Sequence, residues 1–78
     1  MTNPYHVKIA PTAQKQILAL SVKHRKHVFK LIEALAINPR PPGVNRIEGM
    51  TGLYSEAVND ARIIYKVEEQ EVLVLLIR

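Results

Sequence analysis

The chain has 78 residues, of which 47% are hydrophobic and 23% are charged, and it contains no cysteine. This length provides one modest core, so we expect residues 1–78 to form a single domain. The lack of cysteine excludes disulfides, thiolate metal sites and a cysteine nucleophile. The longest aliphatic run, residues 72–77, is far too short to cross a bilayer, and the N-terminus has no signal-peptide pattern, so we expect a cytoplasmic protein with no membrane contact.

The net charge of +4 is unevenly distributed along the chain. Residues 1–46 carry eight Lys and Arg and one acid, whereas residues 47–78 carry three Lys and Arg and six acids. This asymmetry predicts a basic face that meets phosphate or an acidic protein segment. A solvated surface fits a basic patch equally well.

The first predicted elements are a strand and a helix. Apolar side chains alternate through residues 5–9, and this period of two indicates a strand. Pro11 ends the strand, and Thr12 is expected to cap the helix that follows. The apolar face of that helix carries Ala13, Ile17 and Leu20.

A longer amphipathic helix comes next. Ser21 can cap its N-terminus, and Asn38-Pro39 ends it because a residue before proline avoids the helical region. Spacings of three and four dominate its apolar set, which is Val22, Val28, Phe29, Leu31, Ile32, Leu35 and Ala36.

The second half of the chain predicts strands. After a stiff loop at residues 40–43, a short strand is expected at residues 46–48, with Gly49 and Gly52 permitting a bend. Further strands are predicted at residues 53–58 and 62–67, joined by an Asn59-Asp60 hairpin turn.

The last predicted strand, residues 72–77, is apolar at every position. Such a run is typical of a strand that is buried on both faces or flanked on both sides, so we expect it to lie centrally in the sheet. The short connections predict a mainly antiparallel sheet. Both helices must cover one face of it, which gives a two-layer α+β domain of order β-α-α followed by three or four strands, written β-α-α-β-β-β.

Lysines repeat at spacings of three and four on the longer helix. Lys23, Lys26, His27 and Lys30 share one side, and phosphate or a carboxylate-rich partner would relieve their mutual repulsion. His24 and His27 have no evident third ligand, so no metal or other cofactor is expected. The candidate nucleic-acid-binding residues are Lys23, Arg25, Lys26, Lys30 and Arg46.

Arg62 begins a strand directly after the hairpin turn and can present its planar fork to a phosphate. Alternatively, it pairs with Glu56 or Asp60 across the hairpin. Tyr54 and Tyr65 can offer a hydroxyl or a stacking ring, although tyrosines at such strand positions are more often half-buried in a core.

Nearly the whole chain resembles the RelE/ParE toxin superfamily. The most telling stretch runs from Leu53-Tyr54 to Asn59-Asp60 and on to Arg62-Ile63-Ile64-Tyr65. The resemblance also includes the opening strand at residues 5–9, the helix end at residues 35–39, Gly43, residues 46–49 and the final strand at residues 72–77.

The resemblance implies a β-α-α-β-β-β fold with the first strand beside the last. It implies a toxin that forms a hetero-oligomer with a cognate antitoxin, encoded next to it and expected to be acidic. RelE-like members cleave mRNA in the ribosomal A site, where the 2′-hydroxyl attacks the adjacent phosphate. Arg62 falls on the family's sheet arginine and would stabilise the phosphoryl charge. No residue stands out as a general base or acid. From the residues present, Tyr65 is the candidate and Tyr54 the second, although the ordinary tyrosine pKa is about 10.

The chain departs from the RelE pattern at several positions. Ser55 and Ala57 stand where active RelE-like toxins often have basic residues, and Ala61 replaces an aromatic residue. The sequence ends at Arg78, before the family's Gly-His-Arg or Gly-Lys-Arg segment. The leading hypothesis is a ribosome-dependent mRNA endoribonuclease. The alternatives are a ParE-like, non-enzymatic inhibitor of DNA gyrase and a degenerate toxin that only binds its antitoxin.

Overall fold

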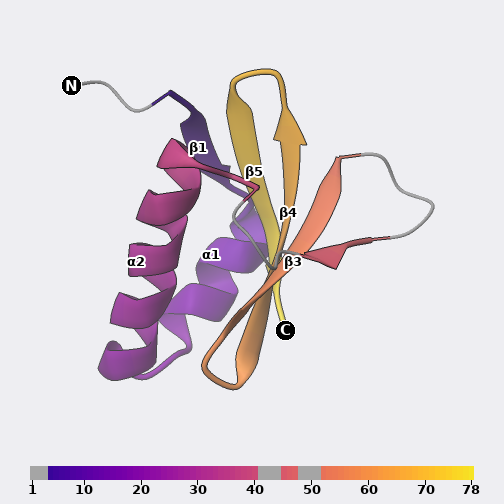
Figure 1. The fold of residues 1–78 in the computed structure, drawn as a ribbon. Coiled ribbons are helices and arrows are strands. Elements are labelled where there is room, and N and C mark those ends of the chain that lie inside the picture. The colour runs from indigo at the N-terminus through magenta and orange to yellow at the C-terminus, as the bar shows by residue number, and fades with distance from the viewer. Residues whose placement is uncertain (1–3, 41–44, 48–51) are drawn as a thin grey trace.

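A computed structural model describes residues 4–40, 45–47 and 52–78. In it, two helices cover one face of a sheet, and the other face is left open (Figure 1). The predicted two-layer α+β fold is confirmed. The elements are β1 (His6–Ile9), α1 (Pro11–Leu18), α2 (Val22–Ile37), β2 (Asn45–Arg46), β3 (Leu53–Val58), β4 (Ala61–Glu68) and β5 (Glu71–Ile77).

The five strands lie in the order β1-β5-β4-β3-β2. β1 runs parallel to β5, and the remaining neighbours are antiparallel. The first strand therefore lies beside the last, and β5 is an interior strand between β1 and β4, as expected. The predicted loop at residues 41–43, the end of the predicted short strand at residue 48 and the bend at Gly49 lie outside the described residues.

Of the two predicted helix N-caps, one is confirmed and one is wrong. Ser21 Oγ accepts a hydrogen bond from the His24 amide (3.3 Å), which confirms the predicted cap of α2. The prediction for Thr12 is wrong, because α1 begins at Pro11 after an extended Ala10 and has no side-chain cap. Proline suits the first helical position, since its φ is already helical and it lacks the N–H that would need a partner.

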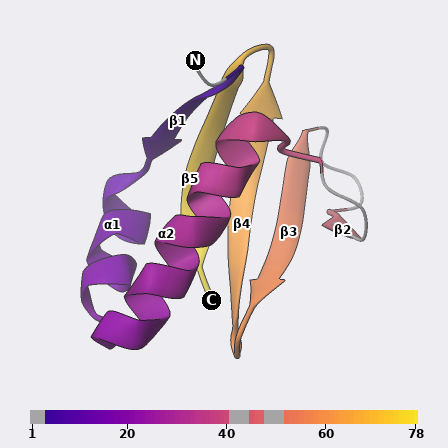
Figure 2. The same ribbon diagram turned by 60° about the vertical axis from the view of Figure 1, so that its left-hand side comes forward.

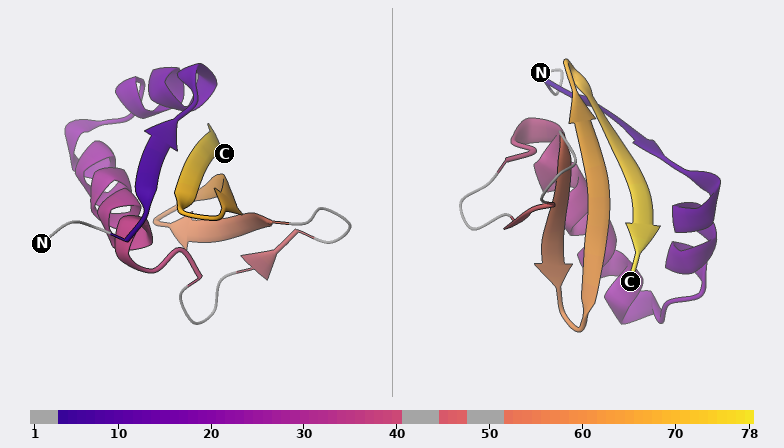
Figure 3. Two further views of the ribbon diagram at one scale, coloured as in Figure 1. Left: turned by 90° about the horizontal axis from the view of Figure 1, so that it is seen from above. Right: turned by 90° about the vertical axis from the view of Figure 1, so that its right-hand side faces the viewer.

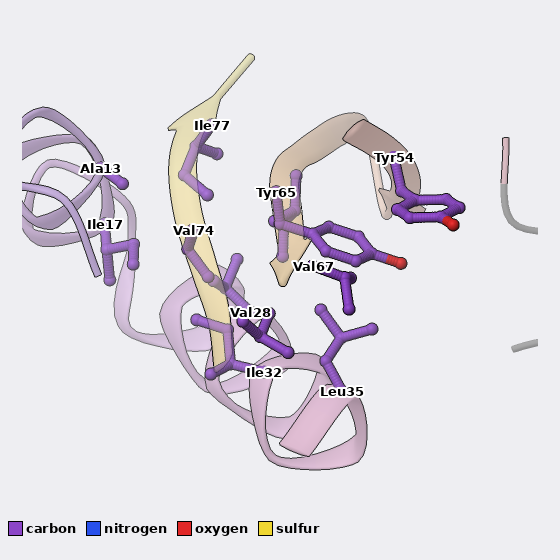
Figure 4. Close-up of a cluster of buried hydrophobic side chains, with 12 residues drawn as sticks. Ala13, Ile17, Val28, Ile32, Leu35, Tyr54, Tyr65, Val67, Val74 and Ile77 are labelled. Atoms are coloured by element: carbon purple, nitrogen blue, oxygen red, sulfur yellow. The ribbon is translucent and has the colours of Figure 1, made fainter. Parts of the chain in front are cut away.

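The core lies between the helices and the sheet (Figure 4). Leu35 of α2 and Tyr65 of β4 are both fully buried within it. The other buried members come from both helices and three strands: Ala13, Ile17, Val28, Ile32, Tyr54, Ile63, Val67, Val72, Val74 and Ile77.

Left-handed backbone occurs in three turns of the described residues, at Gly52, Asn59 and Glu69. Asn59, in the β3–β4 turn, has a φ of 53°, a conformation that asparagine tolerates. Gly52, just before β3, has a φ of 80°, and a Cβ there would lie 3.0 Å from the carbonyl oxygen of Val67. Glycine at residue 52 therefore permits both the turn and the close approach of β4.

Of the two arrangements expected for β5, the structure shows the second, a strand flanked on both sides by β1 and β4. Val72, Val74 and Ile77 are buried against the helices, whereas the side chains between them are only partly buried. A continuous apolar run arises here because the open face of the strand is also apolar. Those partly buried residues are Leu73, Leu75 and Leu76.

Candidate functional site

Arg62 lies on the open face of the sheet, which Figure 3 (right) shows turned toward the viewer. Its neighbours in β4, Ala61 and Ile63, face the helices and contribute to the core, so Arg62 points to the opposite side. Arg62 Nε donates to Ser55 Oγ at 3.0 Å. Among the described residues it forms no ion pair, so the alternative pairing with Glu56 or Asp60 is not observed.

A second arginine lies directly opposite Arg62. The Arg62 amide donates to the Arg78 carbonyl at 3.0 Å, and the Arg78 amide donates to the Arg62 carbonyl at 2.8 Å. Residues that exchange both hydrogen bonds are an antiparallel pair whose side chains share one face. Sequence reasoning missed Arg78, because only the β4–β5 register places it there.

Apolar residues and ion pairs occupy the rest of the open face. Ile64 is opposite Leu76, and Leu73 is opposite Lys66, so these side chains lie together on it. Two ion pairs lie toward its far end, Lys8–Glu71 (2.9 Å) and Lys66–Glu68 (2.6 Å). They border a shallow hollow of about 200 Å³ lined by Lys8, Lys66, Glu68, Glu71, Val72 and Leu73.

The Lys8–Glu71 pair shifts the titration of both groups. The Lys8 ammonium lowers the pKa of the Glu71 carboxyl, first through their hydrogen bond and then through charge. Glu71 in turn raises the pKa of Lys8. Both side chains are exposed, so water screens the pair and its contribution to stability is small.

Tyr65 does not join Arg62. Its side chain faces the helices and is fully buried, and its hydroxyl donates to the Pro39 carbonyl at 2.7 Å. Burial raises the pKa of this hydroxyl well above the usual tyrosine value. Tyr65 therefore ties the end of α2 to the sheet, and our proposal for the site does not include it.

Tyr54 is also on the helix-facing side, in a cluster of aromatic and basic groups. Its ring stacks on Tyr65 with centroids 5.8 Å apart, and its hydroxyl accepts from Arg40 Nε at 2.9 Å (Figure 4 shows the two rings). The Arg40 guanidinium lowers the pKa of Tyr54, and Arg46 adds to the effect. Arg46 is opposite Tyr54 in the β2–β3 pair, so it lies at this corner and not beside Arg62.

The basic residues of α2 are on the other side of the molecule from Arg62. Lys23, Lys26 and Lys30 are exposed on the helix layer, which Figure 2 shows in front of the sheet. Arg25 is held by α1, because its Nη2 donates to the carbonyls of Leu18 (3.2 Å) and Leu20 (3.3 Å). The predicted site residues thus lie in separate places: the open face, the α2 surface, the α1–α2 junction, the Tyr54 corner and the core.

No helix in the described part of the chain is long and apolar enough to cross a membrane. Within residues 4–40, 45–47 and 52–78, no group of three or more His, Cys, Asp or Glu side chains is arranged to hold a metal ion.

A family model describing the ParE toxin of the type II toxin–antitoxin system parDE matches residues 7–78. The match spans the strands, both helices and the two arginines of the open face. Among curated proteins, none matches this chain by sequence.

Several solved structures with the same fold are toxin–antitoxin complexes. A chain of the archaeal RelE–RelB complex from Pyrococcus horikoshii OT3 matches with a TM-score of 0.86 and 26% identity, covering 96% of this chain and 93% of that chain. A chain of the RelBE complex of E. coli matches with a TM-score of 0.82 and 22% identity, covering 94% of this chain and 93% of that chain. A chain of the RelBE2 complex of Mycobacterium tuberculosis matches with a TM-score of 0.81 and 21% identity, covering 95% of this chain and 95% of that chain. The matched family and the shared architecture identify the chain as a type II toxin–antitoxin toxin of the RelE/ParE superfamily.

Proposed function

We propose that this toxin acts on translation in the manner of RelE, by cleaving mRNA on the ribosome. The observation that supports this is the Arg62–Arg78 pair, two guanidinium groups on one open sheet face with no carboxylate partner among the described residues. Two neighbouring like charges repel each other unless an anion lies between them. A phosphate of the mRNA backbone would accept hydrogen bonds from both guanidinium groups and neutralise their charge.

The chemistry assigned to the pair is electrostatic. The 2′-oxygen of a ribose attacks the adjacent phosphorus, the bond to the 5′-oxygen breaks, and negative charge develops on the non-bridging oxygens. Arg62, held by Ser55 Oγ, and Arg78, held by the β4–β5 ladder, would donate to those oxygens. We assign no side chain as general base, because Tyr65 is sealed in the core and the nearest lysine on this face, Lys66, is paired with Glu68.

We further propose that the cognate antitoxin covers this same face. Ile64, Leu73 and Leu76 form its apolar centre, and Arg62 and Arg78 lie at one end. An amphipathic segment with acidic side chains would bury the apolar centre and form ion pairs with the two arginines. Those ion pairs would block phosphate binding. The relatives solved as toxin–antitoxin complexes support the existence of such a partner, and the chemistry of the open face supports its location.

Inhibition of DNA gyrase without catalysis is the second candidate. The observation in its favour is that both sheet tyrosines face the helices and Ser55 and Ala57 flank Arg62 in place of basic residues. The open face would then serve as a protein-binding surface, with its arginines meeting acidic groups of the target.

The test is to map mRNA 5′ ends on purified translating ribosomes with the wild-type chain, Arg62→Ala and Arg78→Ala. We expect wild-type cleavage in the A site and a loss of about 100-fold or more for each variant, the usual cost of removing a group that stabilises developing charge. Lys15→Ala, which removes an exposed cation on α1, is the matched control and should cleave normally.

Full cleavage by both arginine variants would contradict the assignment. Absent cleavage combined with inhibited gyrase supercoiling would favour the ParE-like function. If neither activity appears and only antitoxin binding remains, the chain is a degenerate toxin.

A further inference from the structure

The outer side of α2 carries a stripe of five residues. Val22, Lys26, Phe29, Glu33 and Ile37 follow one another at spacings of four, three, four and four, so they line one side of the helix. We call this set the outer stripe. Figure 2 shows α2 lying in front of the sheet, with the other described elements behind or beside it.

The outer stripe exposes large apolar side chains. Val22 and Ile37 are each 63% exposed and Phe29 is 42% exposed, which makes three of the four large hydrophobics exposed in the described residues. The solvent side of a helix is ordinarily polar. These three instead lie at the two ends and the middle of the helix, over a length of roughly 22 Å at 1.5 Å per residue.

The charged residues of the stripe have no ion-pair partner in the part of the chain that the structure describes. Lys26 and Glu33 are both exposed, and neither forms an ion pair among the described residues. They are seven residues apart, or about 10 Å along the helix axis, which is beyond contact distance.

The outer stripe is complementary to itself when read in the opposite direction. Val22 and Ile37 are equally far from the centre of α2, and Lys26 and Glu33 are also equally far from it. In an antiparallel pair of α2 helices, Val22 meets Ile37 of the second copy, and Lys26 meets Glu33 of the second copy. Phe29 meets its own equivalent beside the two-fold axis.

We propose that a second copy of this chain docks on the outer stripe to form an antiparallel α2–α2 homodimer. A two-fold axis makes the contact isologous, so each complementary pair occurs twice. The two Lys26–Glu33 pairs select the antiparallel register, and the apolar residues supply burial. One helix face is a small interface, and the neighbouring Lys23 and Lys30 add repulsion, so the dimer is weak and reversible.

Charge reversal tests the register, with association measured by sedimentation velocity over a concentration series. Lys26→Glu places a carboxylate opposite Glu33 of the second copy, and Glu33→Lys places an ammonium opposite Lys26. Each variant alone should associate at least tenfold more weakly than wild type. An equal mixture of the two variants should associate again, because every pair across the heterodimer is then opposite in charge.

Controls separate the stripe from general effects of charge and folding. Lys23→Glu makes the same charge change as Lys26→Glu on the same helix but outside the stripe, and it should not weaken association. Phe29→Ser should weaken association without reversing any charge. Circular dichroism checks that each variant is folded, which is expected because the substituted side chains are exposed.

Several outcomes would overturn the proposal. These are a chain that stays monomeric at every concentration, a dimer that tolerates both charge reversals, and a mixture that fails to restore association. A chain that is monomeric alone but whose stripe becomes protected when an antitoxin binds would assign the surface to the antitoxin instead.

Discussion

Tyr65 illustrates how a residue's surroundings decide its role. By type and position it can serve in proton transfer or in a core, and in the fold its ring is buried and its hydroxyl donates to Pro39. That bond joins the segment after α2 to the centre of the sheet. The hydroxyl is therefore expected to contribute to stability and not to reactivity.

Tyr65→Phe should destabilise the protein by about 1–3 kcal/mol, because it leaves the buried Pro39 carbonyl without its donor. Denaturant unfolding measures the change. Tyr5→Phe, which alters a partly exposed ring, is the control. Unchanged stability would mean that water or a backbone shift replaces the lost bond.

The two sheet tyrosines should ionise in a fixed order. Arg40 lowers the pKa of Tyr54, whereas burial raises that of Tyr65, so Tyr54 loses its proton first as the pH rises. Because folding raises the pKa of Tyr65, its effect on stability is fully present below the pKa of an unfolded tyrosine, near ~10, and is lost at higher pH. Ultraviolet absorbance of tyrosinate in a Tyr5→Phe background would follow both groups. Ionisation of Tyr65 before Tyr54 would contradict this order.

At the scale of elements, α2 depends on its ends as well as on its apolar face. Ser21 supplies the N-cap, and Asn38-Pro39 ends the helix after Ile37. Both boundaries follow from local rules, because caps and proline act within a few residues of the chain. The predicted helix and the observed one agree for this reason.

Ser21→Ala should cost about 1 kcal/mol, since the His24 amide loses its acceptor. Thr12→Ala is a matched control, because Thr12 is exposed in the first turn of α1 and caps nothing. Thermal or denaturant unfolding compares the two variants. Equal losses of unfolding free energy in the two variants would show that the Ser21 cap does not stabilise α2.

The uneven burial of β5 also belongs to this scale. Hydrophobicity showed that both sides of the strand are apolar, but it could not show what covers each side. The helices cover Val72 and Val74, while Leu73 and Leu76 share the open face with Arg62. An uncovered apolar face is what a toxin with a removable partner requires, and we expect the antitoxin to supply that cover.

At the scale of the whole molecule, the two basic surfaces lie on opposite sides. The α2 lysines are on the helix layer, and Arg62 with Arg78 is on the open face of the sheet. Their roles should therefore separate, with general attraction to RNA on one side and phosphate stabilisation on the other.

Replacing Lys23, Lys26 and Lys30 together with alanine should weaken ribosome binding and reduce the slope of log affinity against log salt by about 2, or ~0.7 per phosphate contact. Cleavage of mRNA once bound should be unchanged, whereas Arg62→Ala should mainly reduce cleavage. Binding measured over a salt series, together with single-turnover cleavage, distinguishes the two effects. An unchanged salt slope would mean that the lysines face solvent in the complex.

The sequence by itself determined the two amphipathic helices, the Ser21 cap of α2, the β3–β4 turn and the family, because these depend on periodicity, local chemistry and residue order. It also identified Arg62 as the candidate for phosphate. Only the tertiary structure placed Arg78 opposite Arg62, sealed Tyr65 in the core and set the α2 lysines on the far side. Those placements depend on strand register and layer packing, which bring together residues distant in the chain and leave no local pattern in the sequence.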